Sequence, residues 1–337
     1  MVTIKDIARA LGISPSTVTR ALAGNPRISA ATIQRVRQQA GLMGYVADSA
    51  ARAMQCGTSA LVGLLVPDIE NLFYASMART VAQSCHAAGY QLVLSVTEDD
   101  PANEEQHIRA LIGARCAGVL LVPTGGITDG SCRLLDKVPT VQLIRRTDKL
   151  ASSSIGIDDR KALFAATGYL LDSGHRRIGL LAGDDSLDTS RARRRGFSDA
   201  HATHSLQPDP ALTRLGVPRA SHGRDAALAL LAMAQPPSAI LAAGAALTEG
   251  MLDAVSAHYG SARPAVSLLG FGDSAACRWW QGDGLSTITL PMPEIAQTAW
   301  ERLLALIDNP AADPVEPTII SLDTGIVLRG STRPPSD

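Results

Sequence analysis

The chain has 337 residues, of which 46% are hydrophobic and 19% charged, and its formal net charge is −1. This length is enough for more than one domain, and no segment reaches the roughly 18 apolar residues of a membrane span. The five cysteines are dispersed without a Cys-x-x-Cys pair, which argues against a zinc or redox site. Charges at positions 5, 6 and 9 leave no room for the apolar core of a signal peptide. We therefore expect a cytoplasmic protein without a metal, a cofactor or a membrane partner.

The first 22 residues predict two short helices joined by a tight turn. Between Ile4 and Leu11, apolar residues recur three and four positions apart, so one stripe faces a small core. Thr3 followed three residues later by Asp6 is a typical start signal for a helix. A glycine then supplies the turn, and Ser14 begins the second helix.

The outward face of the second helix carries Ser16, Thr17 and Arg20. Close approach to a DNA major groove requires small side chains, and arginine reads guanine edges bidentately. Residues 1–58 hold seven basic and two acidic residues, a net charge of +5, so the remaining residues carry about −6. A basic end on an acidic body is expected where one end of a protein meets phosphate. The pattern favours a DNA-binding helix-turn-helix.

The helical region continues beyond these two helices. Ser29 predicts the start of a third helix, because its hydroxyl can cap the first turn. Residues 46–55 form an alanine-rich stretch, which predicts a linker with helical propensity.

From Ala60 onward, short apolar runs alternate with helical stretches. Runs such as Leu61–Pro67 and Gly118–Pro123 are separated by helical stretches such as Phe73–Ala88. Near-continuous apolar strands that alternate with helices imply parallel sheets covered on both faces. The remaining 278 residues are too many for one such sheet, so we expect two α/β lobes.

Ligands of open parallel sheets sit beyond the carboxyl ends of the strands, and this selects candidate pocket residues. After the first strand, Asn71 can cap a helix, and Phe73 and Tyr74 can stack on a sugar face. Arg145 follows the fourth strand, and Asp158 follows the next one. We expect these five residues to line a ligand pocket.

Motifs of the common enzyme classes are missing from the sequence. There is no Gly-x-Gly-x-x-Gly turn after the first strand, no Gly-x-Ser-x-Gly elbow and no phosphate-binding loop. His175 lies in a turn before a strand, which is typical of a structural residue rather than a catalytic base. We therefore predict no catalytic residues and no enzymatic activity.

Three strings of residues carry a resemblance to a known family. Ile-Lys-Asp-Ile-Ala-Arg at residues 4–9, Gly-Ile-Ser-x-x-Thr-Val-Thr-Arg-x-Leu at residues 12–22, and Gly44-Tyr45 closely resemble the headpiece of the lactose repressor (LacI/GalR) family of bacterial transcription regulators. The likeness continues from Val2 to about Thr332. It implies an all-α helix-turn-helix headpiece followed by two α/β lobes. These lobes resemble those of periplasmic sugar-binding proteins and are joined by crossover strands around a ligand cleft.

The resemblance also implies an order of domains. The headpiece would span residues 1–45, a hinge helix and linker residues 46–58, and a two-lobed effector-binding and dimerisation domain residues 59–337. We expect lobe 1 to hold about residues 59–158 and 289–317, and lobe 2 about residues 159–288 and 318–332.

Contacts to DNA follow from the same resemblance. In the family, two hinge helices of a dimer enter the minor groove together, and a leucine from each wedges into the central base step. Met54 occupies the leucine position here. The expected DNA-binding residues are Pro15, Ser16 and Arg20 for the bases, Thr17 and Tyr45 for the backbone, and Ala51 and Met54 for the hinge.

Further effector-binding residues follow from the segment 188–197. It resembles the family's loop and helix start, in which one arginine reaches the effector. Counting back from Gly196-Phe197, that arginine is Arg193, with Thr189 one turn earlier on the same side. Trp280 is another candidate for the pocket wall, although tryptophans more often pack in a core or an interface.

Two departures from the family pattern bear on the ligand. Gly244-Ala245 stands where Asn-Asp is usual, and Gly272 replaces an aspartate that commonly holds ligand hydroxyls. Arginine binds acidic ligands and aspartate repels them, so this exchange favours an anionic effector such as a sugar acid or a sugar phosphate. Glu249 can supply a hydrogen-bond acceptor in place of the missing aspartate, so a neutral sugar stays open as the alternative effector.

We therefore expect a homodimeric, ligand-responsive transcription regulator that binds a pseudopalindromic operator in double-stranded DNA, as a repressor released by an inducer. Ala47-Asp48 replaces the usual Pro-Asn at the start of the hinge helix, which predicts weaker or more conditional DNA binding. Two alternatives stay open: a corepressor-dependent regulator, and a ligand-binding module with weakened DNA binding. No heptad tail follows Gly330, so a tetramer is not expected.

Overall fold

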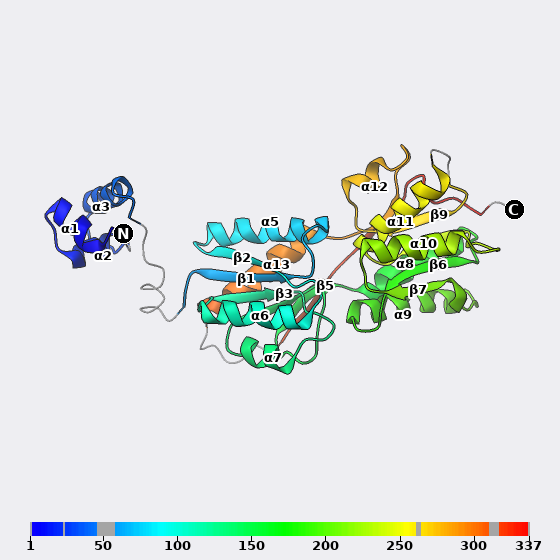
Figure 1. Cartoon of the computed structure of the whole chain (residues 1–337), viewed down its shortest axis with the longest axis horizontal. Helices are drawn as coiled ribbons and strands as arrows, with labels where there is room; N and C mark the ends of the chain where they lie inside the picture. Colours follow the sequence, from blue (N-terminus) through cyan, green and yellow to red (C-terminus); the bar gives the residue numbers. More distant parts are fainter. Residues whose placement is uncertain (1, 23, 46–57, 261–263, 310–316, 336–337) are drawn as a thin grey trace. The chain divides into compact units, whose positions relative to one another are not determined.

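Two units make up the chain, residues 1–59 and residues 60–337, and each is described by itself. Figure 1 labels their helices and strands. The candidate hinge residues Ala51 and Met54 lie outside the described part of the chain. The computed structural model describes residues 2–22, 24–45, 58–260, 264–309 and 317–335.

Three helices form the headpiece, and each begins where the sequence predicts a cap. Thr3 and Asp6 make both hydrogen bonds of a capping box at the start of α1. The hydroxyl of Ser14 accepts a hydrogen bond from the Thr17 amide at 3.1 Å, and Ser29 caps α3 in the same way. The helices are α1 (Ile4–Leu11), α2 (Pro15–Leu22) and α3 (Ala30–Leu42).

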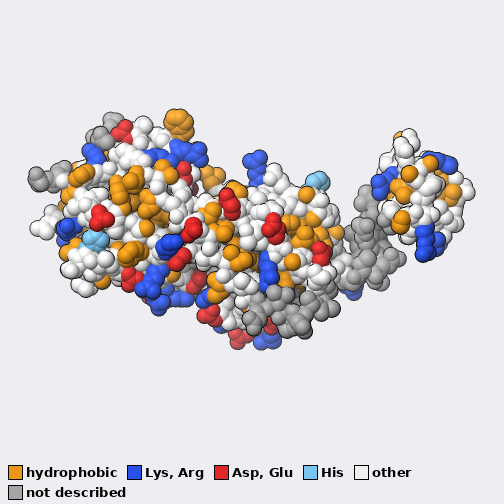
Figure 2. Space-filling view, turned by 180° about the vertical axis from the view of Figure 1, so that it is seen from behind, with side chains coloured by type: hydrophobic (Ala, Val, Ile, Leu, Met, Phe, Trp, Pro, Cys, Tyr) orange, Lys and Arg blue, Asp and Glu red, His pale blue; other side chains and the backbone are white. Residues whose placement is uncertain are grey.

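The headpiece has a small apolar core and a basic surface. Ile7, Val18 and Val36 are fully buried, one from each helix, and smaller side chains fill the space between them. Residues 2–45 carry six basic side chains and one acidic side chain. The face seen in Figure 2 shows Lys and Arg on the headpiece but no acidic side chain.

Lobe 1 is a parallel six-stranded sheet in the order β11-β5-β4-β3-β1-β2. Its strands are β1 (Leu61–Val66), β2 (Gln91–Val96), β3 (Gly118–Leu121), β4 (Thr140–Leu143), β5 (Ser153–Ile157) and β11 (Ile319–Leu322). Its helices are α5 (Leu72–Ala87), α6 (Pro101–Gly113), α7 (Asp129–Leu135) and α13 (Met292–Asp308).

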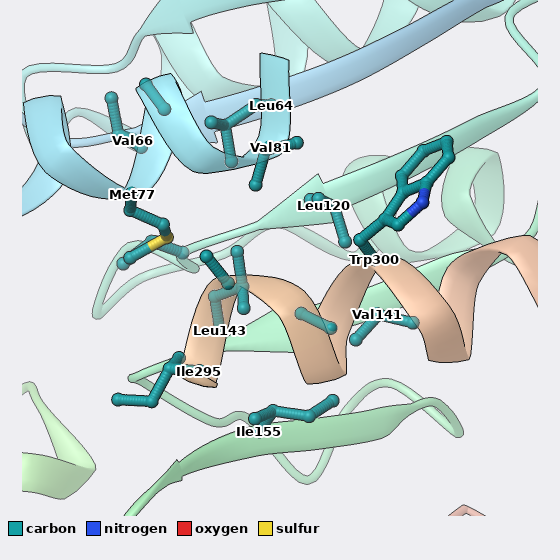
Figure 3. Close-up of a cluster of buried hydrophobic side chains, with 14 of the residues drawn as sticks. Leu64, Val66, Met77, Val81, Leu120, Val141, Leu143, Ile155, Ile295 and Trp300 are labelled. Atoms are coloured by element: carbon teal, nitrogen blue, oxygen red, sulfur yellow. The ribbon is translucent and has the colours of Figure 1, made fainter. Parts of the chain in front are cut away.

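The core of lobe 1 lies on both faces of its sheet. On one face, Met77 and Val81 of α5 share a buried cluster with Ile295 and Trp300 of α13, as Figure 3 shows. On the other face, α6 and α7 contribute a second cluster that includes Ile108. Burial on both faces explains why the strands read as continuous apolar runs.

Lobe 2 is a second six-stranded sheet in the order β12-β10-β9-β8-β6-β7, in which only β12 runs antiparallel to its neighbour. Its strands are β6 (Ile178–Gly183), β7 (Thr213–Gly216), β8 (Ala239–Ala242), β9 (Ser267–Phe271), β10 (Ser286–Thr289) and β12 (Gly325–Val327). Its helices are α8 (Asp159–Asp172), α9 (Asp188–Thr203), α10 (Ala220–Leu231), α11 (Ala245–Tyr259) and α12 (Ala275–Trp279), with a 3₁₀ turn at Pro210–Leu212.

Two glycines let the helices of lobe 2 pack closely in pairs. A Cβ atom on Gly196 of α9 would lie 2.1 Å from the carbonyl oxygen of Arg160 in α8. A Cβ atom on Gly250 of α11 would lie 2.0 Å from the carbonyl oxygen of Ala220 in α10. No side chain fits at such distances, so these contacts between helix backbones require glycine.

Within the described residues, the chain passes between the lobes after β5, after β10 and between β11 and β12. The expected boundary at residue 317 is therefore too early, because it assigns β11 to lobe 2. β11 pairs with β5 in the sheet of lobe 1, where Ile320 and Leu322 pack against the core cluster. Lobe 1 thus extends to Leu322.

No helix among the described residues combines the length and the apolar character that a membrane crossing requires.

Candidate functional site

The exposed face of α2 is the first candidate site. Pro15, Ser16 and Arg20 are exposed, and Thr17 is partly exposed. The hydroxyl of Ser14 lies 2.9 Å from that of Ser16 and 2.8 Å from that of Thr17, which holds both hydroxyls in place. Among the described contacts, Arg20 has no ion pair, so its guanidinium is available for a partner such as a base edge.

Tyr45 has a different setting from the four residues on α2. Its ring is partly buried and packs against the core of the headpiece, and its amide donates a hydrogen bond to the Ala40 carbonyl at 2.9 Å. The ring therefore helps to fix the end of α3. A contact of its hydroxyl with the DNA backbone remains a prediction.

A cavity of about 580 Å³ between the two lobes is the second candidate site. It lies beyond the carboxyl ends of β1, β2, β4, β6, β8 and β9, where ligands of parallel sheets are expected. The walls of the cavity include six of the eight effector-binding residues that the sequence predicts: Asn71, Phe73, Tyr74, Arg145, Thr189 and Arg193.

Asp158 and Trp280 do not line this cavity. Asp158 is the N-cap of α8, where its carboxylate accepts a hydrogen bond from the Lys161 amide at 2.9 Å. Trp280 follows α12 and packs against the core of lobe 2, in the wall of another cavity beside Pro264 and Arg333. We predicted Asp158 because it follows the end of a strand. The carboxylate that contacts Arg193 belongs to the next residue, Asp159.

The side chain of Arg145 is held by a buried ion pair with Asp99. The two groups form a bidentate contact, in which Nη2 of Arg145 lies 3.2 Å from Oδ2 of Asp99. Ile144 has a φ angle of 62°, in the left-handed region that β-branched residues rarely adopt, whereas Asp99, at 58°, is of a residue type that adopts it more readily. Such strain persists where the surroundings over-determine it, and here it accompanies the ion pair on the cavity wall.

Arg193 makes three contacts that fix it in the wall. Its Nε donates to Oδ1 of Asp159 at 2.6 Å, its Nη1 donates to the Ala243 carbonyl at 2.9 Å, and its guanidinium lies 4.1 Å from the ring centre of Phe271. Burial raises the pKa of Asp159 to about 6, although the charge of Arg193 opposes that rise. Arg193 lines the cavity, so its remaining N–H groups can donate to a ligand hydroxyl, while Asp159 holds the guanidinium in place.

Carboxylates outnumber guanidiniums in the cavity wall. The acidic wall residues are Asp68, Glu70, Glu98, Asp99 and Glu249, whereas the basic ones are Arg145, Arg193 and Arg219. Two of these arginines are already paired with carboxylates of the protein. The expected preference for an anion rested on arginines without acidic partners, so this wall offers a weaker basis for it.

Two hydrogen bonds join the lobes beside the cavity. The backbone N–H of Arg146 in lobe 1 donates to Oδ2 of Asp188 in lobe 2 at 3.1 Å. In the opposite direction, Nη2 of Arg219 in lobe 2 donates to the Glu98 carbonyl of lobe 1 at 3.1 Å. A change in the separation of the lobes would break or form these bonds.

Several wall residues were missed by the sequence analysis. Asp99 follows β2 directly, so the rule that selected Asn71 and Arg145 could have found it. Phe271 is the last residue of β9, where its apolar side chain gives the same sequence signal as any other buried strand residue. Asp159, which holds Arg193 but does not itself line the cavity, carried no signal of its own, because only the fold turns it toward that arginine.

Comparison with known proteins relates this chain to a family of bacterial regulatory proteins. Residues 3–48 match the family described as bacterial regulatory proteins, lacI family, and residues 167–332 match a periplasmic binding protein-like domain. The HTH-type transcriptional regulator GalR of Escherichia coli (strain K12) is 30% identical over 92% of this chain and 90% of its own length. The HTH-type transcriptional repressor CytR of the same strain is 27% identical over 98% of this chain and 96% of its own length.

The fold comparison agrees with these relatives. The lac repressor dimer bound to operator and the anti-inducer ONPF has a TM-score of 0.82 at 22% sequence identity, over 98% of this chain and 99% of that chain.

Proposed function

The chain belongs to the lacI family of bacterial regulatory proteins and is a DNA-binding transcription regulator rather than an enzyme, and we propose that it is a dimeric repressor of carbohydrate-metabolism genes released by a small-molecule inducer. Its operator would be a pseudopalindrome in double-stranded DNA, and it would act in the cytoplasm on the nucleoid. The exposed face of α2 is the observation that carries the DNA-binding part: its hydroxyls are held in place, and Arg20 is exposed and makes no ion pair among the described residues.

The effector that the cavity supports best is hydroxyl-rich and neutral. Arg145 with Asp99 presents donors and an acceptor side by side in the wall, which suits vicinal hydroxyls, and Arg193 adds further donors. Phe73 and Phe271 supply rings against which the apolar face of a sugar can lie. A sugar acid or a sugar phosphate is the competing effector class, and it would meet five carboxylates in the wall.

The inducer would act by changing the relative position of the two lobes. Wall residues come from both lobes, so a bound ligand favours one separation of the lobes over others. In a dimer, that separation would determine whether the hinge segments can pair on DNA.

Selection of genomic DNA fragments with the purified protein, without ligand, tests this function. We expect enrichment of one pseudopalindrome, followed by its release on titration with a neutral sugar. Arg193→Gln should keep the enrichment and lose the release, because it changes the cavity wall and leaves the exposed face of α2 as it is; urea unfolding checks that the variant is folded under the conditions of the assay. Arg195→Gln, which removes the same charge from an exposed position two residues away, should keep both.

Other outcomes would replace parts of the proposal. Enrichment only in the presence of ligand would identify a corepressor-dependent regulator. Release by sugar acids or sugar phosphates, but not by neutral sugars, would restore the anionic effector. The absence of enrichment under every condition would leave a ligand-binding module with weakened DNA binding.

A further inference from the structure

We propose that Arg219 is a gate at the rim of the cavity between the lobes, and that its guanidinium must leave the Glu98 carbonyl before a ligand can enter or leave. The inference goes beyond the proposed function, because it concerns the exchange of any ligand with this cavity and not the chemistry of the effector.

The exposed residues of the cavity wall mark the rim where the cavity meets solvent. On the side of lobe 1 they include Glu70 and Glu98, and on the side of lobe 2 they include Arg219 and Ser221. Buried wall residues such as Tyr74 lie deeper. Nη2 of Arg219 donates to the Glu98 carbonyl at 3.1 Å, so this side chain crosses the rim from one lobe to the other.

The acceptor of this hydrogen bond is held firmly in lobe 1. Glu98 and Asp99 have φ angles of 56° and 58°, so the chain turns sharply after β2. The Glu98 amide donates to the Pro67 carbonyl at 3.0 Å, and the carboxylate of Asp99 pairs with Arg145. The Glu98 carbonyl is therefore fixed, and Arg219 is the partner that can move.

Arg219 is held less firmly than the other two arginines of the wall. Arg145 and Arg193 pair with carboxylates, and their side chains are only 7% and 13% exposed. Arg219 is exposed, and the described contact of its side chain is a single hydrogen bond to an uncharged carbonyl. Such a bond is weaker than a charge-assisted pair, and at an exposed position water can replace it.

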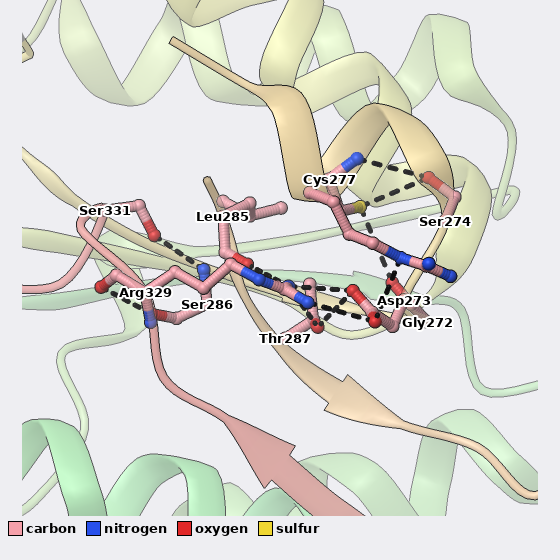
Figure 4. Close-up of polar contacts among 10 residues, drawn as sticks. Gly272, Asp273, Ser274, Cys277, Leu285, Ser286, Thr287, Arg329 and Ser331 are labelled. Carbon is pink, nitrogen blue, oxygen red and sulfur yellow. Dashed lines mark hydrogen bonds and ion pairs between the residues drawn. The ribbon is translucent and has the colours of Figure 1, made fainter. Parts of the chain in front are cut away.

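Lobe 2 also contains a fixed arginine, which shows the difference. In Figure 4, Nη2 of Arg329 lies 3.0 Å from Oδ2 of Asp273, and its Nη1 donates to the Leu285 carbonyl at 2.7 Å. Arg219 instead occupies the N-cap position of α10, and its side chain does not cap that helix. The guanidinium of Arg219 can therefore swing away without disturbing the start of α10.

On another side of the cavity, the lobes are joined by a bond that needs no moving side chain in lobe 1. The backbone N–H of Arg146 donates to Oδ2 of Asp188, the first residue of α9. This bond can stay in place when Arg219 releases the Glu98 carbonyl. We therefore expect the cavity to open at Arg219 while the lobes remain joined at Asp188.

Labelling of a cysteine inside the cavity measures this opening without any effector. Ser190 is buried and lines the cavity, and Ser190→Cys puts a thiol in place of its hydroxyl. The probe is N-ethylmaleimide, because the approach of an uncharged reagent does not depend on the charge of Arg219. Mass spectrometry of the peptide that contains residue 190 gives the labelling rate. Arg219→Gln should raise this rate about three- to ten-fold, the change in population that the loss of one hydrogen bond brings.

Two controls separate the gate from charge and from general loosening of the fold. Arg224→Gln removes the same charge from α10, where Arg224 pairs with Asp253 and lies outside the cavity wall, so it should leave the rate unchanged. Cys85 is fully buried in the core of lobe 1, and its labelling reports unfolding in the same sample. Its rate should not respond to Arg219→Gln. Arg219→Lys keeps a charged donor on a different side chain, so its rate at residue 190 should be intermediate.

Ligand exchange gives a second measurement, made with the native Ser190. The probes are glucose, galactose, ribose and xylose, and stopped-flow fluorescence follows their binding to the full-length protein. For a sugar that binds, Arg219→Gln should raise the association and dissociation rate constants by the same factor and leave Kd unchanged. A faster dissociation alone would show that Arg219 holds the ligand, and the gate would be wrong.

Equal labelling of residue 190 with and without Arg219→Gln would overturn the inference and leave the proposed function intact. So would an equal acceleration at Cys85, which would mean that the whole fold has loosened, or by Arg224→Gln. If none of the four sugars binds, the labelling rates still decide for or against the gate, and only the sugar effector of the proposed function is contradicted.

Discussion

Arg193 joins three elements of lobe 2 at the cavity wall. Its guanidinium contacts a carboxylate, a backbone carbonyl and an aromatic ring, which come from α8, the end of β8 and β9. The carboxylate belongs to Asp159, which is buried. Removal of a charge from such a pair costs more than the pair contributes, because it leaves the other charge buried and uncompensated.

The stability of two variants tests this dependence. We expect Arg193→Gln to lower the free energy of unfolding by about 3 kcal/mol, the usual cost of an orphaned buried charge. Adding Asp159→Asn removes that charge, so the double variant should be more stable than Arg193→Gln alone. Urea unfolding of both variants measures the difference. A double variant that is no more stable than the single one would show that Asp159 is not an uncompensated charge.

The titration of Asp159 gives a second test at the same pair. Burial raises the pKa of this carboxyl from 3.8 to about 6, so the folded protein binds its proton more tightly than the unfolded chain. The stabilisation from that proton is fully present below pH 3.8 and is lost as the pH rises to about 6. Asp159→Asn lacks this loss, so its stability relative to wild type should rise between these pH values, by about 3 kcal/mol, and then stay constant. Urea unfolding from pH 4 to 8 measures it, and a difference independent of pH would contradict the shift.

Site residues were predictable where one rule about position was enough. The carboxyl ends of strands and the arginine before Gly196-Phe197 selected six residues that line the cavity. The same rule failed at Asp158, because adjacent residues at a helix start point in different directions and only the packed fold distinguishes them. Trp280 was chosen for its chemistry alone, and its chain segment leads it to the core of lobe 2 instead.

At the scale of elements, lobe 2 is built from helix pairs whose backbones touch. Gly196 in α9 faces Arg160 in α8, and the contact has no space for a side chain. Gly168 in α8 is also helical, but a Cβ atom there would meet nothing within 4 Å. Both glycines lower the stability of their helix in the same way, because glycine has a low helix propensity. Only at Gly196 does the packing of a neighbouring helix exclude a larger side chain.

Alanine at these two positions should change stability in opposite directions. Gly196→Ala should lower the free energy of unfolding by roughly 1–3 kcal/mol, because the helices must separate to admit a methyl group. Gly168→Ala should raise it by up to about 1 kcal/mol, because alanine favours the helix. Thermal and urea unfolding of both variants measure the two effects. A neutral Gly196→Ala would mean that α8 and α9 are not in backbone contact.

Elements were predictable wherever their signals were local. The capping box at Thr3 and the cap at Ser29 lie within one helical turn of the amides that they bind, so the sequence alone locates both helix starts. The assignment of β11 failed because its place depends on pairing with β5, more than 150 residues earlier in the chain. Nothing inside residues 319–322 indicates which of two parallel sheets this strand joins.

At the scale of the whole molecule, two copies of α2 in a dimer would present the same face to two half-sites of an operator. A single half-site engages only one recognition helix, so the full pseudopalindrome should bind about 100-fold more tightly or better. Arg20→Gln should weaken binding to the full site by about 1–3 kcal/mol for each bidentate base contact that is lost. Its effect on unrelated DNA should be much smaller, because only one charge per protomer is removed.

A matched variant distinguishes the loss of a base contact from the loss of a positive charge. Arg9→Gln removes the same charge from α1, where the arginine side chain is 81% exposed and pairs only loosely with Asp6 at 3.5 Å. Loss of a positive charge that faces phosphate weakens binding to all sequences alike, so Arg9→Gln should reduce affinity for the operator and for unrelated DNA by the same factor. Fluorescence anisotropy at fixed salt, with full-site, half-site and unrelated duplexes, gives all the ratios. If Arg20→Gln also weakens both kinds of DNA equally, Arg20 contacts phosphate, and the sequence is read by the remaining exposed residues of α2.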